Sequence, residues 1–211
     1  MEFQILEASA THLKYAENIC EMMANAARER GTGIAKREPV YIEGKIRDGK
    51  AVIALKGEQL AGFCYIESWG HGKYVANSGL IVSSDFRKTG LARSIKQKVF
   101  ELSQKHYPES KIFGITTSLA VMKINADLGY RPVTFSELTT DEQFWKGCAS
   151  CKNYDILNRT ERAHCLCTGM LFDPEKHIAI ATKPVEKEKR WQRFIKFFQK
   201  KITEKKITES A

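Results

Sequence analysis

The 211-residue sequence lacks any apolar run approaching the ~20 residues that a membrane-spanning helix needs. Its N-terminus lacks a basic region followed by an apolar stretch, so it is not typical of a secretory signal. Internal repeats are also missing. Hydrophobic residues make up 43% and charged residues 28%, which excludes a chain that is disordered throughout. We therefore expect a cytoplasmic protein with one full core, alone or with a small appendage.

The formal net charge of +9 favours an anionic partner, such as nucleic acid, a lipid surface or a phosphorylated cofactor. Most of this excess lies at one end of the chain. Residues 183–211 hold ten Lys and Arg against four Glu, so they carry +6 and leave only +3 for residues 1–182. The total charge therefore says little about the main domain.

The basic C-terminal segment, residues 183–211, has the pattern of an amphipathic helix. One helical face would carry its apolar residues, namely Trp191, Phe194, Ile195, Phe198 and Ile202. The opposite face would carry basic residues, namely Lys189, Arg193, Lys196 and Lys200. Such a helix docks on the core or on another subunit of a homo-oligomer, or it contacts a membrane surface or nucleic acid.

Hydrophobic periodicity predicts strands and helices in alternation. Strands are expected at residues 3–7, 51–55, 59–67, 74–82, 111–117, 131–137 and 177–182, and helices at 13–26, 39–48, 90–106 and 120–128. This order is typical of a mixed α/β layer, in which a ligand usually sits where strand edges diverge. Residues 140–172 break the pattern and contain a cluster of cysteines.

The most informative stretch joins the third long strand to the helix at 90–106. The strand ends with Leu80, Ile81 and Val82, a basic turn contains Arg87, Lys88 and Thr89, and the helix opens with Gly90, Leu91 and Ala92. In this geometry backbone N–H groups and a helix N-terminus point at an anion, ideally a pyrophosphate. An ordinary strand-to-helix turn has the same short pattern.

The pattern Arg87-x-x-Gly90-x-Ala92 after a strand resembles the acyl-CoA-binding signature of the GNAT N-acetyltransferase superfamily. Leu128-Gly129-Tyr130 after a short helix resembles the second motif of that family. The resemblance implies a mixed, mostly antiparallel sheet flanked by helices, with acetyl-CoA or another acyl-CoA as co-substrate. It divides the chain into an acyl-CoA-binding core at 1–138, a Cys-rich knuckle with a final strand at 139–182, and the basic segment.

A narrower resemblance is to the acetyltransferase domain of N-acetylglutamate synthases. It rests on residues 111–117, 129–133 and 34–37, the last followed by Ile42 and Ile46. It implies a small amine as acceptor, glutamate or a similar amino acid, in arginine biosynthesis.

Three residues are candidates for binding this acceptor. Arg37 would hold a substrate carboxylate through two parallel hydrogen bonds, with a surface arginine as the alternative interpretation. Thr116 and Thr117 lie where the sheet should open toward the acceptor, although β-propensity alone also explains them.

In this superfamily the acceptor amine attacks the thioester directly, so a base, an oxyanion site and an acid for the leaving thiol are expected. Two positions depart from the usual pattern. Ala76 stands where many members have a glutamate, and Asn125 stands where many have a tyrosine that protonates the sulfur. Asparagine donates a hydrogen bond but is no general acid. Glu67 and His71 are candidate replacement bases, each of which is otherwise a solvated loop residue.

Four cysteines form the pattern Cys148-x2-Cys151 and Cys165-x-Cys167. They predict a closed, structural zinc site with four thiolate ligands, in which His164 is a possible substitute. Unrelated reduced thiols or a redox-sensitive pair are the alternatives. With the basic segment, such a zinc knuckle defines a second hypothesis, a nucleic-acid-binding protein built on a degenerate acyltransferase fold.

Overall fold

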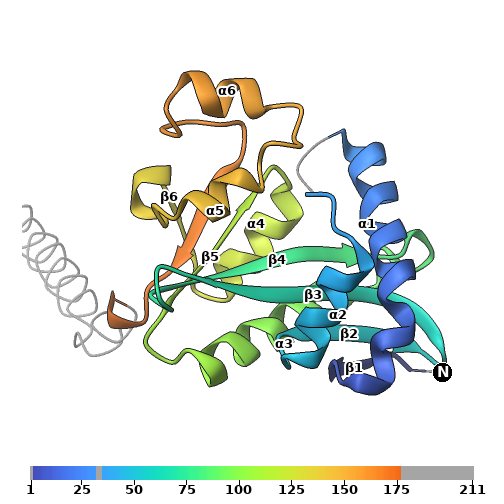
Figure 1. Cartoon of the computed structure of the whole chain (residues 1–211). Helices are drawn as coiled ribbons and strands as arrows, with labels where there is room; N and C mark the ends of the chain where they lie inside the picture. The colour runs from blue at the N-terminus through green and yellow to red at the C-terminus, as the bar shows by residue number, and fades with distance from the viewer. Residues whose placement is uncertain (1, 32–34, 177–211) are drawn as a thin grey trace, which may run out of the picture. The chain divides into compact units, whose positions relative to one another are not determined.

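A seven-stranded sheet runs through the computed structural model, which describes residues 2–31 and 35–176 (Figure 1). Its order is β1-β2-β3-β4-β5-β7-β6. The strands are β1 Gln4–Glu7, β2 Ala51–Lys56, β3 Gln59–Trp69, β4 Tyr74–Val82, β5 Lys111–Thr116, β6 Arg131–Val133 and β7 Thr168–Phe172. All neighbours pair antiparallel except β4 and β5, which are parallel. This confirms the predicted mixed, mostly antiparallel sheet.

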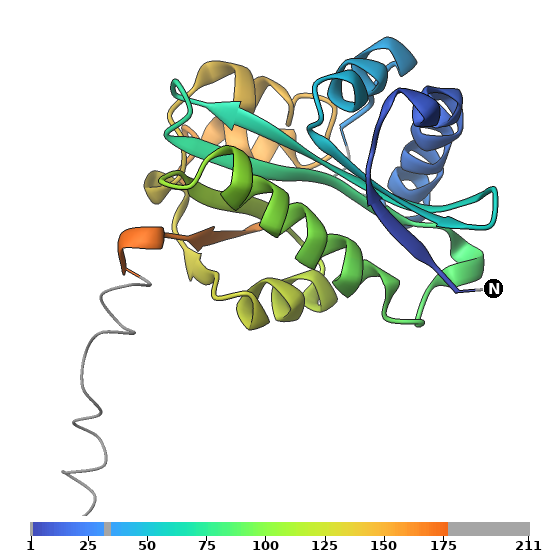
Figure 2. The same ribbon diagram turned by 90° about the horizontal axis from the view of Figure 1, so that it is seen from below.

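Helices cover both faces of the sheet, as Figure 2 shows. The helices are α1 Ala16–Arg30, α2 Pro39–Arg47, α3 Leu91–His106, α4 Leu119–Asp127, α5 Glu142–Lys146 and α6 Tyr154–Arg159. α3 and α4 lie on one face, and α1, α2, α5 and α6 lie on the other. Within the described residues, no helix is both long enough and apolar enough to cross a bilayer.

Helix α3 forms the main contact with its face of the sheet. Leu91, Ile95, Val99 and Leu102 recur at helical spacing and are all buried. They join one core cluster with strand residues such as Ile66. The helical spacing of apolar residues that predicted α3 therefore puts these residues on the face that packs against the sheet. On the other face, α1 and α2 bury a second cluster against β2 and β3.

The end of the fold differs from the sequence prediction. The expected strand at 177–182 and the basic segment at 183–211 lie outside the described residues. Instead β7, at Thr168–Phe172, inserts between β5 and β6. Sequence periodicity missed it because four of its five residues are buried, so no alternation of apolar and polar residues marks it. The predicted strand at 131–137 is shorter, since a 3-10 turn takes over at Phe135–Glu137.

Two irregularities open the sheet between β4 and β5. Their parallel pairing runs only from Tyr74 and Lys111 to Ala76 and Phe113. Farther along β4 the register with β3 shifts, because Tyr65 pairs with Ser78 whereas Phe63 pairs with Ile81. The extra residue is a β-bulge, which bends the strand and separates it from its neighbour.

Gly79 makes this bulge possible. Its φ of +65° lies in the left-handed region, and a Cβ atom there would overlap the ring of Tyr65 on β3. Only glycine meets both demands without strain.

We predict that Gly79→Ala lowers the free energy of unfolding by about 2 kcal/mol, because both the backbone conformation and the ring of Tyr65 oppose the methyl group. Gly44→Ala is the matched control, since it lies within α2 and a Cβ there meets no atom within 4 Å. The control should be neutral or stabilising by up to ~1 kcal/mol. Urea unfolding of both variants measures the difference, and equal effects would contradict this role for Gly79.

Candidate active site

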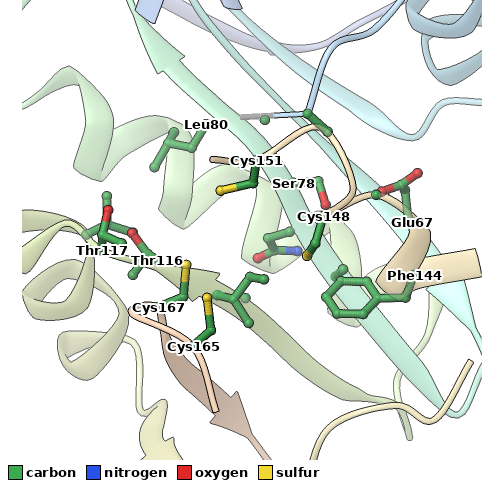
Figure 3. Close-up of a pocket in the computed structure, with 18 of the residues that line it drawn as sticks. Glu67, Ser78, Leu80, Thr116, Thr117, Phe144, Cys148, Cys151, Cys165 and Cys167 are labelled. Atoms are coloured by element: carbon green, nitrogen blue, oxygen red, sulfur yellow. The ribbon is translucent and has the colours of Figure 1, made fainter. Parts of the chain in front are cut away.

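A cavity of about 210 Å³ lies where β4 and β5 diverge. Most of the predicted site residues line it. They are Arg37, Glu67, Leu80, Thr116, Thr117, Asn125, Cys148, Cys151, Cys165 and Cys167. The wall therefore combines β3, β4, β5, α4 and the segment after α5, which the sequence alone does not place together (Figure 3).

Glu67 is the buried carboxylate of this cavity, with only 7% of its surface exposed. It sits directly opposite Ala76 in the β3–β4 pairing, so both side chains project from the same face. Tyr41 on α2 donates a hydrogen bond to its Oε1, and the side chain of Ser78 forms another hydrogen bond with it. Burial raises the pKa of Glu67, while Arg37 and the hydrogen bond from Ser78 oppose that rise.

Two cations flank Glu67. A guanidinium nitrogen of Arg37 lies 3.9 Å from Glu67 Oε2, and Lys45 Nζ lies 3.7 Å from Oε1. Arg37 Nε also donates to the hydroxyl of Tyr65 at 3.0 Å, and its guanidinium lies 4.8 Å from the centre of the Tyr41 ring. The cluster of Arg37, Lys45 and Glu67 therefore carries one net positive charge beside the cavity.

Three polar atoms in the cavity wall are buried without a hydrogen-bond partner among residues 2–31 and 35–176. They are Trp69 Nε1, Asn125 Oδ1 and Asn153 Nδ2. A buried polar atom without a partner costs about 1–3 kcal/mol, so these atoms mark where a polar ligand would be favoured. Because side chains alternate between the two faces of β3, Trp69 lies on the same face as Glu67. No sequence signal pointed to Asn153.

The turn before α3 has the conformation that an anion requires. Lys88 and Gly90 both have positive φ, and the first N–H groups of a helix such as α3 have no partner within the helix. A Cβ on Gly90 would meet none of the described atoms within 4 Å, so the space over the turn is open. The hydroxyl of Thr89 donates to the carbonyl of Phe86 at 2.7 Å. These features fit a pyrophosphate.

The remaining residues of the predicted acyl-CoA site have different surroundings. Arg87 pairs with Glu29 of α1 at 2.7 Å, so a phosphate would compete with that carboxylate. Ile81 and Leu91 are core side chains, which leaves only their backbone for a ligand. Val82 is half-buried against the α3 core, whereas Leu80 lines the cavity.

The threonines and His71 differ in position. Thr116 and Thr117 line the cavity at the end of β5, where Thr116 Oγ1 accepts a hydrogen bond from the N–H of Ser118.

His71 is exposed, has a φ of 55° and lies in the turn after β3. The structure does not place it in the cavity wall, because the turn carries it beyond the end of the strand.

The structure does not support the predicted zinc site. Across residues 2–31 and 35–176, no group of three or more His, Cys, Asp or Glu side chains is placed to hold a metal ion. The four thiols instead line the cavity, with Cys165 and Cys167 side by side and hydrogen-bonded (Figure 3). Burial raises the pKa of Cys148 to about 11 and that of Cys167 to about 12, so both stay protonated at neutral pH.

Residues 18–121 match the acetyltransferase (GNAT) family. The fold and this match define a GNAT-type N-acetyltransferase domain. The chain therefore contains a domain of the GNAT family, which confirms the resemblance of the Arg87–Ala92 motif. No curated protein matches the chain.

Several solved structures share the fold. An N-acetylglutamate synthase from Neisseria gonorrhoeae, complexed with coenzyme A and N-acetyl-glutamate, has a TM-score of 0.58 at 14% identity, covering 82% of this chain and 35% of that one. A putative acetyltransferase from Salmonella typhimurium with acetyl-CoA has a TM-score of 0.58 at 12% identity, covering 82% and 95%.

A third likeness is to diaminobutyrate acetyltransferase from Paenibacillus lautus, bound to its substrate and coenzyme A. Its TM-score is 0.55 at 11% identity, and the match covers 82% of this chain and 95% of that one. At such low identities these three likenesses establish the fold and nothing finer. This chain also spans only about a third of the Neisseria protein.

We expect Arg87→Gln to raise the KM for acetyl-CoA about tenfold with kcat unchanged, because it removes a phosphate contact worth about 1.5 kcal/mol. Glu29→Gln is the control that breaks the same ion pair and leaves Arg87 free. It should lower that KM or leave it unchanged. Steady-state kinetics compares the two, and an equal rise in both would show that the ion pair matters rather than a phosphate contact.

Proposed function

We propose that the protein transfers an acetyl or similar acyl group from acyl-CoA to the amine of an acidic amino acid, with glutamate as the leading candidate. The observation that carries this proposal is the cavity wall between β3 and β5. It combines a buried carboxylate, a guanidinium and unpaired hydrogen-bond donors beside the point where the sheet opens.

Glu67 is the proposed general base. It lies directly across from Ala76, so its carboxylate projects from the face on which many family members carry their glutamate. Burial raises its pKa, which brings it closer to the pKa at which proton transfer from an ammonium is effective. The contacts with Tyr41 and Ser78 hold the carboxylate in place.

The acceptor carboxylates are assigned to two groups of donors. Arg37 is fixed by Tyr65 and Glu67 and suits one carboxylate, because a guanidinium binds it through two parallel hydrogen bonds. Trp69 Nε1 and Asn153 Nδ2 are buried donors in the same wall and suit the second carboxylate. An amino acid with two carboxylates would therefore satisfy groups that are otherwise costly to bury.

In this mechanism the acceptor nitrogen loses a proton to Glu67, directly or through water, and attacks the thioester carbonyl. The resulting oxyanion needs hydrogen-bond donors, and the proposed source is the backbone N–H groups at the Gly79 bulge, where the register of β4 with β3 shifts. Holding the two substrates in line contributes much of the rate.

We predict that Glu67→Gln lowers kcat by about 10²–10⁴, because the amide keeps the shape of the side chain but accepts no proton. The KM for acetyl-CoA should stay within twofold of wild type. Glu109→Gln, an exposed glutamate after α3, is the matched control and should keep full activity. Release of CoA thiol measures the rates, and a fully active Glu67→Gln enzyme would contradict the role of Glu67.

The acceptor assignment is tested with glutamate and analogues that lack one carboxylate. Wild-type enzyme should prefer glutamate, and Arg37→Gln should raise the KM for glutamate at least tenfold, a loss of about 1.5 kcal/mol. The same variant should bind acetyl-CoA normally in a thermal-shift titration. Inactivity of the wild-type protein with every α-amino acid would contradict the proposed acceptor class.

A further inference from the structure

A buried lysine on the opposite side of the open sheet has no role in the reaction described so far. Lys96 lies in the middle of α3, is 2% exposed and lines the same cavity as Glu67. α3 covers the other face of the sheet, so Lys96 reaches the cavity where β4 and β5 no longer pair. A charge buried this deeply is rare unless something holds it there.

The surroundings of Lys96 hold its ammonium with neutral groups. Its Nζ donates to Asn77 Oδ1 at 2.8 Å and lies 4.9 Å from the centre of the Tyr130 ring. The Tyr130 hydroxyl donates to the same Oδ1 at 2.9 Å, and Asn77 Nδ2 donates to Ser103 Oγ at 2.8 Å. No ion pair between Lys96 and a carboxylate occurs in the described part of the chain. Its charge is therefore fixed but not neutralised.

The titratable groups facing Lys96 stay neutral. Cys64 on β3 has its pKa raised by burial to about 11, and burial also raises the pKa of Tyr130 well above its usual range. Burial lowers the pKa of Lys96 to about 8, with Cys64 opposing the shift. Lys96 is thus mostly protonated at neutral pH and gives up its proton more readily than an exposed lysine.

Asn125 on α4 does not supply the proton that the leaving sulfur needs, so another acid is required. Asn125 is 2% exposed and stands where many GNAT enzymes have the tyrosine that protonates the sulfur. Its Oδ1 lacks a partner within residues 2–31 and 35–176, and an amide provides no acidic proton. Asn125 and Lys96 line the same cavity, so the acid that α4 does not supply is available from α3.

We propose that Lys96 is a catalytic residue that donates a proton to the sulfur of the departing coenzyme A. This inference rests on the proposed acyl transfer. When the tetrahedral intermediate collapses, the C–S bond breaks and its electron pair goes to sulfur. One N–H bond of Lys96 supplies the proton that makes the thiol, which leaves a neutral amine. Lys96 then regains its proton from solvent. The acceptor nitrogen loses two protons on its way from ammonium to amide, the first of them to Glu67, which returns it to solvent. The thiol keeps one proton, so the overall reaction releases one.

The test compares Lys96→Met with wild type across a range of pH. Wild-type kcat should fall as pH rises through about 8, because the protonated amine is the active form. Lys96→Met should lower kcat by about 10²–10⁴ and lose this fall, while acetyl-CoA binding by thermal shift is retained. Lys98→Met, a half-buried lysine on the same helix, is the matched control and should keep both kcat and the pH profile.

Two further measurements test the role of Lys96 if the Lys96→Met variant does not fold. Lys96→Arg keeps a positive charge that does not titrate below pH ~12, so its kcat should also drop and show no fall near pH 8. In the wild-type enzyme alone, a kcat that stays level from pH 7 to pH ~10 would overturn the role of Lys96.

The outcomes also separate this inference from the proposed function. A wild-type enzyme that acetylates glutamate, together with an equally active Lys96→Met variant, would overturn only the role of Lys96. A wild-type enzyme that binds acetyl-CoA but acylates no amine would overturn the proposed function and this inference with it.

Discussion

The separation of β4 from β5 is the constraint on which the site depends. The two parallel strands pair only as far as Ala76 and Phe113, and the bulge at Gly79 turns β4 away from its neighbour. The cavity lies at this opening, and residues from both faces of the sheet line it. A sheet paired along its full length would keep Glu67 on one face and Lys96 on the other, with a layer of backbone between them.

This arrangement divides the chemistry between the two faces. Glu67 and Arg37 stand on the face of α1 and α2, where a carboxylate-bearing amine would bind and lose a proton. Lys96 and Asn125 stand on the face of α3 and α4, where the thiol would leave. The proposed base and the proposed acid therefore come from opposite faces of the sheet, and among the described residues Glu67 pairs with Arg37 and Lys45 rather than with Lys96. The segment between α5 and β7 lines the cavity with Cys148 and Cys167, whose thiols burial keeps protonated.

Short sequence patterns predicted those elements whose conformation depends mainly on neighbouring residues. The period of Leu91, Ile95 and Val99 gave α3, and the Arg87-x-x-Gly90 motif gave the turn before it. The positions of Glu67 and His71 needed the structure, because only the folded sheet puts Glu67 in the cavity wall and His71 in the turn beyond the strand. Asn153 and β7 were missed because their environment is created by segments distant in sequence. The zinc prediction rested on the spacing of the four cysteines, and spacing alone does not determine whether their thiols lie close enough to hold a metal ion.

The most direct test of the account is a crystal structure with coenzyme A and glutamate bound. We expect the sulfur in the gap between β4 and β5, within hydrogen-bond reach of Lys96 and beside Asn125. We expect one glutamate carboxylate on Arg37 and the amine facing Glu67. A sulfur placed on the outer surface of α3, or glutamate bound away from Arg37 and Glu67, would contradict it.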